Sequence, residues 1–272
     1  MEKKKTMSEK IEVKEEIVEN TVSFMFRLAD AALWRKLVSA MAPLVDEGMF
    51  HLNPEGITVR AMDPSHVAMV DAEWPKILFE EYHCETSIGL CVNIGEMLKL
   101  LRRLGNEETL ELNYMPQTAK INLLLKGSYL RTFSMATLEP AMEEVPTPKV
   151  TFASSVKLTS TFLRNALEDA AVVSDQVDIE VCEEWFMVKA SGDVGTSAVM
   201  VEKGSEELLS LAVEQSSKAT YSLAYLLDIV KAASPLSDIV TVEFSSNMPI
   251  RLGFELSAGT LRYYLAPRID GA

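Results

Sequence analysis

The side chains that could carry out acid–base, nucleophilic or metal chemistry are few in this sequence. It contains three histidines and three cysteines. The segment Asp63-Pro64-Ser65-His66 could supply a nucleophile or a metal ligand, and His83-Cys84 could begin a zinc site, but neither has further ligands at a spacing that metal geometry favours. A Gly-rich phosphate loop, a Gly-x-Ser-x-Gly elbow and a His-Glu-x-x-His motif are all missing. We therefore predict no catalytic residues, no metal and no cofactor.

Basic residues are the remaining candidates, and the chemistry that they support is binding to phosphate. The 272 residues include 26 Lys and Arg against 40 Asp and Glu, which gives a formal net charge of −14. Such an excess of acidic residues argues against a nucleic-acid partner unless the cations gather on one surface. Whether this acidic chain can bind nucleic acid therefore depends on which elements carry the cations.

Four stretches with helical periodicity each place a cation away from their apolar stripe. The stretches are Ala31–Leu44, Ile94–Leu104, Ser160–Ala171 and Leu223–Ala233, and the cations are Arg35, Lys99, Arg102, Arg103, Arg164 and Lys231. One such helix would be an ordinary solvated face, but four in an acidic chain predict a shared positive surface. Glu168, Asp169 and Asp228 interrupt this surface, and no dense cluster for reading bases is present. We therefore expect loose contact with a phosphate backbone.

The rest of the chain is predicted to be rich in β-structure and duplicated. Six segments alternate apolar and polar residues as strands do: Gly56–Met62, Thr109–Leu112, Ile121–Leu125, Trp185–Ala190, Ile239–Phe244 and Thr260–Leu265. Subtracting the sequence number of Arg35 from that of Arg164 gives 129, and the same offset relates Arg60 to Lys189 and Arg102 to Lys231. We infer two copies of one unit, each with two helices.

A proline-rich segment separates the two copies. Pro140, Pro146 and Pro148 exclude a regular helix and predict an extended connector over residues 139–150, between domains at 21–138 and 151–270. Residues 1–20 are rich in Lys and Glu and are expected to form a flexible extension. No apolar run approaches the roughly 20 residues that a membrane span needs, so we predict no membrane partner.

The sequence closely resembles the proliferating cell nuclear antigen (PCNA) family of DNA sliding clamps, of the archaeal type. The segments that carry the resemblance are 56–67 (GITVRAMDPSHV), 92–108, 231–237 (KAASPLS) and 261–269 (LRYYLAPRI). It implies an α+β fold of duplicated βαββ-type units, in which two similar domains form a subunit and three subunits close into a pseudo-sixfold ring. It also implies a DNA polymerase processivity factor, without catalytic activity, that encircles duplex DNA and tethers replication and repair enzymes.

The resemblance assigns three sets of residues. The set that faces DNA is Arg35, Lys36, Lys99, Arg102, Arg103, Arg164 and Lys231. A pocket for partner peptides consists of Met62, His66, Val67, Met142, Val145, Pro146, Pro249, Tyr264, Leu265, Ala266 and Pro267. Met and Pro would give this pocket an adaptable apolar floor. The edges that join subunits contain Tyr129 and Phe133 on one side and Thr196 and Val199 on the other.

The implied partners are double-stranded DNA, held without sequence preference, and DNA polymerase, the clamp loader, flap endonuclease and DNA ligase, which dock through PIP-type peptides. The trimer could contain three copies of this chain or include paralogues. We expect a cytoplasmic, nucleoid-associated location if the source is archaeal and a nuclear location if it is eukaryotic. Two alternatives stay open. A DNA-modifying enzyme would need a carboxylate cluster or a nucleophile, and an accessory protein of similar shape would not encircle DNA.

Overall fold

The computed structural model of the chain describes residues 23–104, 107–139, 145–146 and 148–268. The N-terminal half contains β1 (Phe24–Leu28), α2 (Ala31–Ser39), β2 (Glu47–Asn53), β3 (Gly56–Met62), β4 (Ala68–Pro75), the 3-10 turn η1 (Lys76–Leu78), β5 (Glu81–Cys84), β6 (Ile88–Asn93), α3 (Ile94–Leu101), β7 (Thr109–Met115), β8 (Lys120–Lys126) and β9 (Leu130–Ala136). The C-terminal half contains β10 (Ser154–Thr159), α4 (Ser160–Ala170), β11 (Gln176–Val181), β12 (Trp185–Gly192), β13 (Gly195–Glu202), β14 (Leu208–Val213), β15 (Ser217–Ser222), α5 (Leu223–Ala233), β16 (Ile239–Phe244), β17 (Ile250–Glu255) and β18 (Thr260–Leu265). The predicted flexible extension over residues 1–20 lies outside the described residues.

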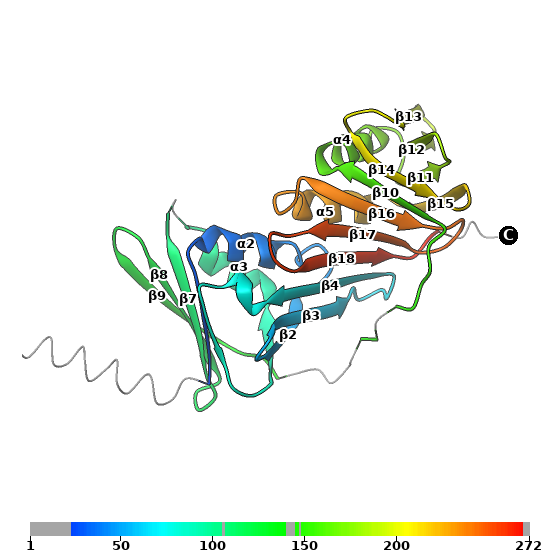
Figure 1. Ribbon diagram of the computed structural model, residues 1–272. Helices are drawn as coiled ribbons and strands as arrows, with labels where there is room; N and C mark the ends of the chain where they lie inside the picture. The colour runs from blue at the N-terminus through cyan, green and yellow to red at the C-terminus, as the bar shows by residue number, and fades with distance from the viewer. Residues whose placement is uncertain (1–22, 105–106, 140–144, 147, 269–272) are drawn as a thin grey trace, which may run out of the picture.

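These strands form three antiparallel sheets. A nine-stranded sheet, in the order β14-β10-β16-β17-β18-β4-β3-β2-β6, contains strands from both halves of the chain. The halves meet where β18 pairs with β4, with Leu261 opposite Ala72 and Tyr264 opposite Met69. Figure 1 shows this sheet across the centre of the molecule, between the five-stranded sheet (β5-β1-β7-β8-β9) and the four-stranded sheet (β13-β12-β11-β15).

The repeat predicted from the sequence is confirmed. α2 begins at residue 31 and α4 at 160, while α3 begins at 94 and α5 at 223, so both pairs have the sequence offset found above. The same offset relates β2 to β11 and β3 to β12. Each helix follows one strand and is followed by at least three, so the βαββ-type unit occurs four times, each time with a third strand after the helix, and β5 and β14 are additional strands.

All four helices begin at the predicted residue, and three of them end earlier than predicted. α2 starts after Asp30, whose carboxylate accepts a hydrogen bond from the first turn, and it ends at Ser39 rather than at residue 44. Pro43 favours this end, because it has no N–H to donate to the Ser39 carbonyl four residues earlier and its ring would clash with that carbonyl. α3 ends at Leu101, whose carbonyl accepts a hydrogen bond from the Leu104 N–H in a tighter turn (3.3 Å). α4 ends one residue early, and α5 has its predicted bounds.

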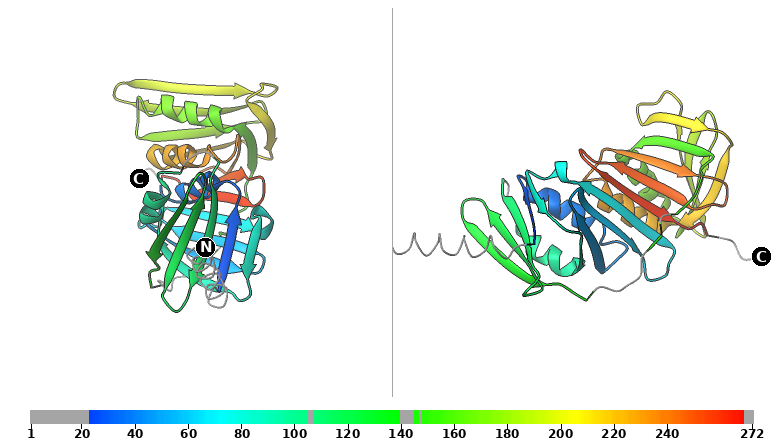
Figure 2. Two further views of the ribbon diagram at one scale, coloured as in Figure 1. Left: turned by 90° about the vertical axis from the view of Figure 1, so that its left-hand side faces the viewer. Right: turned by 60° about the horizontal axis from the view of Figure 1, so that its bottom comes forward.

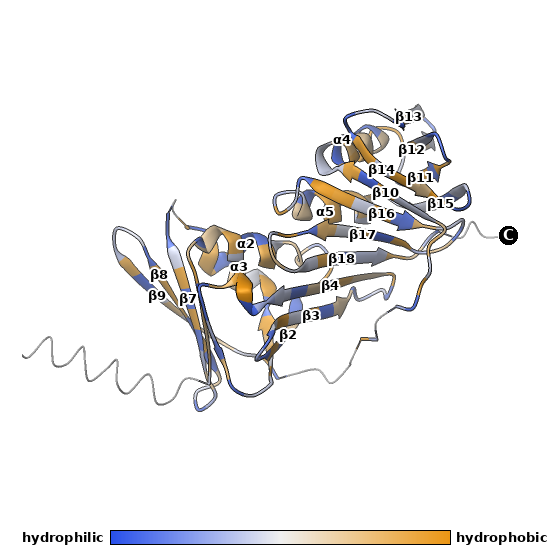
Figure 3. Cartoon of the chain, viewed as in Figure 1, coloured by the Kyte–Doolittle hydropathy of each residue, from blue (hydrophilic) through white to orange (hydrophobic). Residues whose placement is uncertain are grey.

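The core lies between the sheets and a single row of helices. Most strands alternate buried and more exposed residues, and the colouring of Figure 3 shows hydrophobic and hydrophilic residues mixed along them. The rings of Phe26, Phe50 and Trp74 each contact that of Trp34 on α2, with centroids 4.8, 6.0 and 5.5 Å away. The helices contact one another in the order α3-α2-α5-α4, so one row runs through both halves. Within the described residues, no helix has the length and apolar character of a membrane span.

Candidate functional site

The cations predicted to face DNA all lie on the row of helices or directly after it. Lys99, Arg102, Arg103 and Lys231 are exposed, and Arg35, Lys36 and Arg164 are half-buried. On α3 the buried residues are Ile94, Met97 and Leu101, so its cations occupy the opposite, solvated side. The Lys231 ammonium lies 3.3 Å from the Glu168 carboxylate on the neighbouring helix. The row therefore gathers cations from both halves, with one of them beside an acid.

The loop between β3 and β4 is organised by the carboxylate of Asp63. Its Oδ1 accepts hydrogen bonds from the N–H groups of Val67 (2.8 Å) and Ala68 (2.6 Å). Its Oδ2 accepts from the Ser65 N–H (3.0 Å) and from the Tyr225 hydroxyl of α5 (2.8 Å). Burial opposes ionisation of Asp63, but these hydrogen bonds outweigh it and lower its pKa. Asp63 thus shapes the loop and links it to the other half of the chain.

The residues predicted to form the peptide pocket come together around this loop. The Ala266 N–H donates to the Val67 carbonyl (2.8 Å), which places the segment after β18 against the loop. Met69 lies opposite Met62 on one side and Tyr264 on the other in the paired strands. Leu265 pairs with Ile250, the residue after Pro249. The ends of β3, β4, β17 and β18 and the loops beside them therefore converge here.

The predicted residues of the peptide pocket differ in how exposed they are to solvent. Val67 is 38% exposed, and His66 is also exposed, with a backbone φ of 58°. Met62, Pro249, Ala266 and Pro267 are half-buried. Tyr264 and Leu265 are 8% and 2% exposed, so they form the base of this surface rather than its lining. Met142 lies outside the described residues, Val145 is half-buried and Pro146 is exposed.

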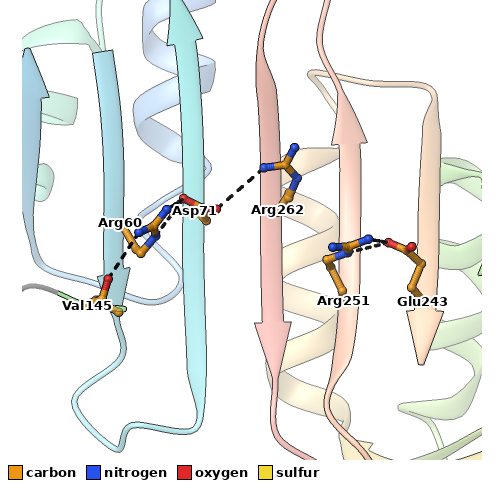
Figure 4. Close-up of polar contacts among 6 residues, drawn as sticks. All are labelled: Arg60, Asp71, Val145, Glu243, Arg251 and Arg262. Atoms are coloured by element: carbon orange, nitrogen blue, oxygen red, sulfur yellow. Dashed lines mark hydrogen bonds and ion pairs between the residues drawn. The ribbon is translucent and has the colours of Figure 1, made fainter. Parts of the chain in front are cut away.

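A line of charged residues crosses the solvent side of the nine-stranded sheet and reaches the connector (Figure 4). Arg60 donates from Nε and an Nη to one oxygen of Asp71, at 3.1 and 3.0 Å. Its other Nη lies 3.5 Å from the carbonyl of Val145. Arg262 on β18 lies 3.9 Å from the second oxygen of Asp71, across the junction between the halves. Arg60 therefore ties the connector to the sheet beside the predicted pocket.

The two smaller sheets end in strands whose outer edges have no strand partner among the described residues. β9 is the last strand of the five-stranded sheet, which Figure 2 (left) shows toward the viewer, and β13 is the last strand of the four-stranded sheet. Tyr129 and Leu130 are 66% and 59% exposed at the first edge, and Met200 is 49% exposed at the second. Phe133 and Val199 are partly buried against the core, and Thr196 is exposed. Both edges thus present unpaired backbone and apolar side chains to solvent.

The described residues contain no group of three His, Cys, Asp or Glu side chains that could hold a metal ion. An open cavity of about 260 Å³ lies where the turn after α2 and the Asp63 loop face α5. Its polar lining consists of Asp63, Ser65, Tyr225 and Asp228, and the Asp63 carboxylate already accepts four hydrogen bonds. The nucleophile or metal-ligand interpretation of the Asp63-Pro64-Ser65-His66 segment therefore has no support in the geometry.

Sequence reasoning missed the structural roles of Asp63, Tyr225 and Arg60. The Asp-Pro-Ser order is a turn signal, because Asp side chains bond to backbone N–H groups two residues on, and it could have indicated the role of Asp63. Tyr225 is 162 residues from Asp63, and Arg60 contacts a connector residue 85 positions away, so no local pattern reveals either contact.

Together these features define a class of protein: a duplicated subunit with one layer of cation-bearing helices, a shared sheet and an open strand edge at each end. Residues 23–140 match the N-terminal domain of proliferating cell nuclear antigen, and residues 146–269 match its C-terminal domain. The chain belongs to the proliferating cell nuclear antigen family. It is a sliding clamp of the DNA polymerase processivity type and not an enzyme.

Individual relatives agree with this assignment. DNA polymerase sliding clamp 1 of Pyrobaculum aerophilum is 35% identical over 242 residues, which cover 89% of this chain and 96% of the relative. The DNA polymerase sliding clamp of Thermofilum pendens is 33% identical over 252 residues, which cover 92% of this chain and 100% of the relative. The crystal structure of PCNA from Thermococcus kodakaraensis superposes with a TM-score of 0.85 at 26% identity, over 90% of this chain and 100% of that one.

Proposed function

We propose that three copies of this chain join end to end, β9 of one to β13 of the next, and enclose duplex DNA with the row of helices facing inward. In this assembly residues 21–138 and 151–270 are the two clamp domains of a subunit, linked by residues 139–150. The supporting observation is that the two edge strands β9 and β13 are the repeat equivalents of β18 and β4, which pair with each other inside the chain. A five-stranded sheet joined to a four-stranded one gives a second nine-stranded sheet, like the one that β18 and β4 complete.

The repeat also predicts the register of this joint, because β9 is the repeat equivalent of β18 and β13 that of β4. Matching the first residues of these strands aligns Leu130 with Thr260 and Gly195 with Ala68. Thr260 lies opposite Glu73 in the internal junction, so its equivalent in the joint is Leu130 opposite Met200. These two exposed apolar side chains would cover each other, which removes an edge that would otherwise favour aggregation.

The same alignment accounts for the predicted interface residues Phe133 and Val199. They correspond to Tyr263 and Ala72 in the internal junction, which are 0% and 1% exposed. Their present partial burial would therefore be completed when two subunits join.

DNA would be held by enclosure rather than by a tight binding site. The seven predicted cations lie on the helix row, which suits non-specific contact with phosphates, and the net charge of −14 opposes strong binding elsewhere on the surface. A closed ring needs little affinity, because DNA leaves only when the ring opens or at a DNA end. This reconciles an acidic protein with a DNA-based role.

Partner enzymes would dock on the surface around the Asp63 loop. Met62, Val67 and Pro267 offer apolar contact, and backbone groups near Ala266 offer a polar anchor for the Gln of a PIP-type peptide. DNA polymerase, the clamp loader, flap endonuclease and DNA ligase are the expected users of this site. Because the relatives described above are named from archaea, a cytoplasmic location at the nucleoid is the one we propose.

The mass of the purified chain in solution tests self-closure. Light scattering should give about three times the monomer mass of 30.2 kDa. A mass near that of the monomer at high concentration would contradict a homotrimer and indicate that paralogues are required. Docking is tested by calorimetry with a Gln-x-x-Leu-x-x-Phe-Phe peptide, for which we expect a Kd on the order of 1 μM. A matched peptide with Ala-Ala in place of Phe-Phe is the control. The absence of a difference between them would remove the docking site.

A further inference from the structure

The row of helices is electrostatically unequal in its two halves. The N-terminal half, α2 and α3 with the turn after α3, carries the cations Arg35, Lys36, Lys99, Arg102 and Arg103 against the single acid Glu96. The C-terminal half, α4 and α5, carries Arg164 and Lys231 against Glu168, Asp169 and Asp228. The formal charges are therefore +4 and −1. The repeat makes these halves equivalent in position, so the difference lies in the side chains alone.

Ion pairs increase this difference in charge between the two halves of the helix row. Lys231 is the repeat equivalent of Arg102, and its ammonium lies 3.3 Å from Glu168. Among the residues that the structure describes, Lys99, Arg102 and Arg103 have no carboxylate within ion-pair distance of their side chains. Asp169 and Asp228 are exposed. A phosphate near α3 would thus meet unpaired cations, whereas one near α4 and α5 would meet a neutralised lysine and two free acids.

We propose that the N-terminal half of each subunit makes the contacts with the DNA backbone, and that Glu168, Asp169 and Asp228 keep the C-terminal half from doing so. This inference rests on the proposed function, since it requires DNA inside the ring. In a ring of three copies, three attractive sectors then alternate with three weakly repulsive ones. DNA would be attracted to one sector at a time rather than held equally by six.

Removing the acids should therefore strengthen binding. In the variant Glu168→Gln, Asp169→Asn, Asp228→Asn, the C-terminal half changes from −1 to +2. The acids are exposed, and losing the exposed Lys231–Glu168 pair costs little stability, so the ring should stay assembled. The affinity for a short fluorescent duplex at low salt should rise about threefold to tenfold, and it should fall more steeply with added salt, because more counterions are released.

Two further variants make the test specific. Glu183→Gln, Glu184→Gln, Glu206→Gln changes the net charge equally, but its exposed residues lie in the connections β11–β12 and β13–β14 rather than on the helices. It should raise the affinity less than the helix substitutions do at low salt, and leave it within about twofold of the parent at 0.15 M salt, where the Debye length is about 8 Å. Lys99→Gln, Arg102→Gln should weaken binding more than Arg164→Gln, Lys231→Gln, although both remove two cations.

The outcomes separate this inference from the proposed function. The inference would be overturned if the substitutions at Glu168, Asp169 and Asp228 and the control substitutions raised the affinity for DNA equally, or if the two pairs of cation substitutions lowered it equally. Either result is compatible with a parent ring that is retained on circular DNA. A parent protein that is never retained on circular DNA would instead remove the proposed function itself. A larger gain for the helix substitutions than for the control, together with the larger loss for Lys99 and Arg102, is the result that we expect.

Discussion

Replacing Asp63 by Asn tests whether one carboxylate holds the loop on which partner docking depends. Asn keeps an oxygen that can accept from the Val67 and Ala68 N–H groups, but it places an NH₂ group where Oδ2 now accepts from Ser65 and Tyr225. The Ser65 N–H then faces another donor and loses its bond, whereas the Tyr225 hydroxyl can turn and accept from the NH₂ group. The lost bond to a charged group costs about 1.5 to 3 kcal/mol, and the other bonds weaken without the charge, so Asp63→Asn should destabilise the protein by about 2 to 4 kcal/mol.

The assay is urea unfolding of parent and variant at one fixed protein concentration, with Tyr225→Phe as the matched control. Tyr225→Phe removes one of the four hydrogen bonds and should cost about 1.5 kcal/mol. Peptide affinity should fall in Asp63→Asn, because Val67, which bonds to Ala266, is held by the same carboxylate. An Asp63→Asn variant within about 1 kcal/mol of the parent, with unchanged peptide affinity, would refute this reasoning.

Asp63→Asn should also remove the contribution that this carboxylate makes to the pH dependence of the unfolding free energy. The pKa of Asp63 is lower in the folded protein than its ordinary value of 3.8, so its stabilising effect is present above that value and is lost as the pH falls through the folded pKa. The difference in unfolding free energy between parent and Asp63→Asn should therefore shrink below about pH 4. A difference that stays constant down to pH 2 would show that the carboxylate charge is not involved.

Three other predictions concern the docking surface, the subunit edge and the connector. Met62→Glu should weaken peptide binding by several kcal/mol in calorimetry while the trimer mass is unchanged, because a charge would have to be desolvated against the peptide; equal affinity would exclude Met62 from the site. Phe133→Glu should release monomers in light scattering, since the equivalent Tyr263 is fully buried, and an unchanged trimer would exclude this edge. Arg60→Ala should speed proteolysis of the connector by freeing the Val145 carbonyl, whereas Arg251→Ala, which breaks a pair with Glu243 on the same sheet, should not; equal rates would show that Arg60 does not tie the connector down.

The elements with the strongest local patterns were predictable from the sequence. β3, β16, β18 and α5 have the predicted bounds, because alternation or an apolar stripe continues until a turn interrupts it. The helix predicted to reach residue 44 was too long, because apolar residues continue past Ser39 as buried turn residues and imitate a helical stripe. The repeat made the equivalence of the halves predictable as well.

The contacts that shape the candidate site were not predictable in the same way. Tyr225 reaches Asp63 only because α5 packs against α2 and the Asp63 loop, and Arg60 reaches Val145 only because that residue of the connector lies beside β3. The predicted pocket residues Tyr264 and Leu265 are mostly buried, since the junction of β18 with β4 covers them. Sequence distance hides such contacts, and only the resemblance to a family placed these residues near one another.

The central claim is that the protein encircles DNA, and retention on a circle tests it most directly. The chain, loaded by a clamp loader onto nicked circular DNA, should remain on the circle during gel filtration in high salt, because enclosure does not depend on ionic contacts. Cutting the circle once with a restriction enzyme should release it, since the ring can then slide off the ends. Loss from the intact circle in high salt, or equal retention on cut and uncut DNA, would contradict encirclement.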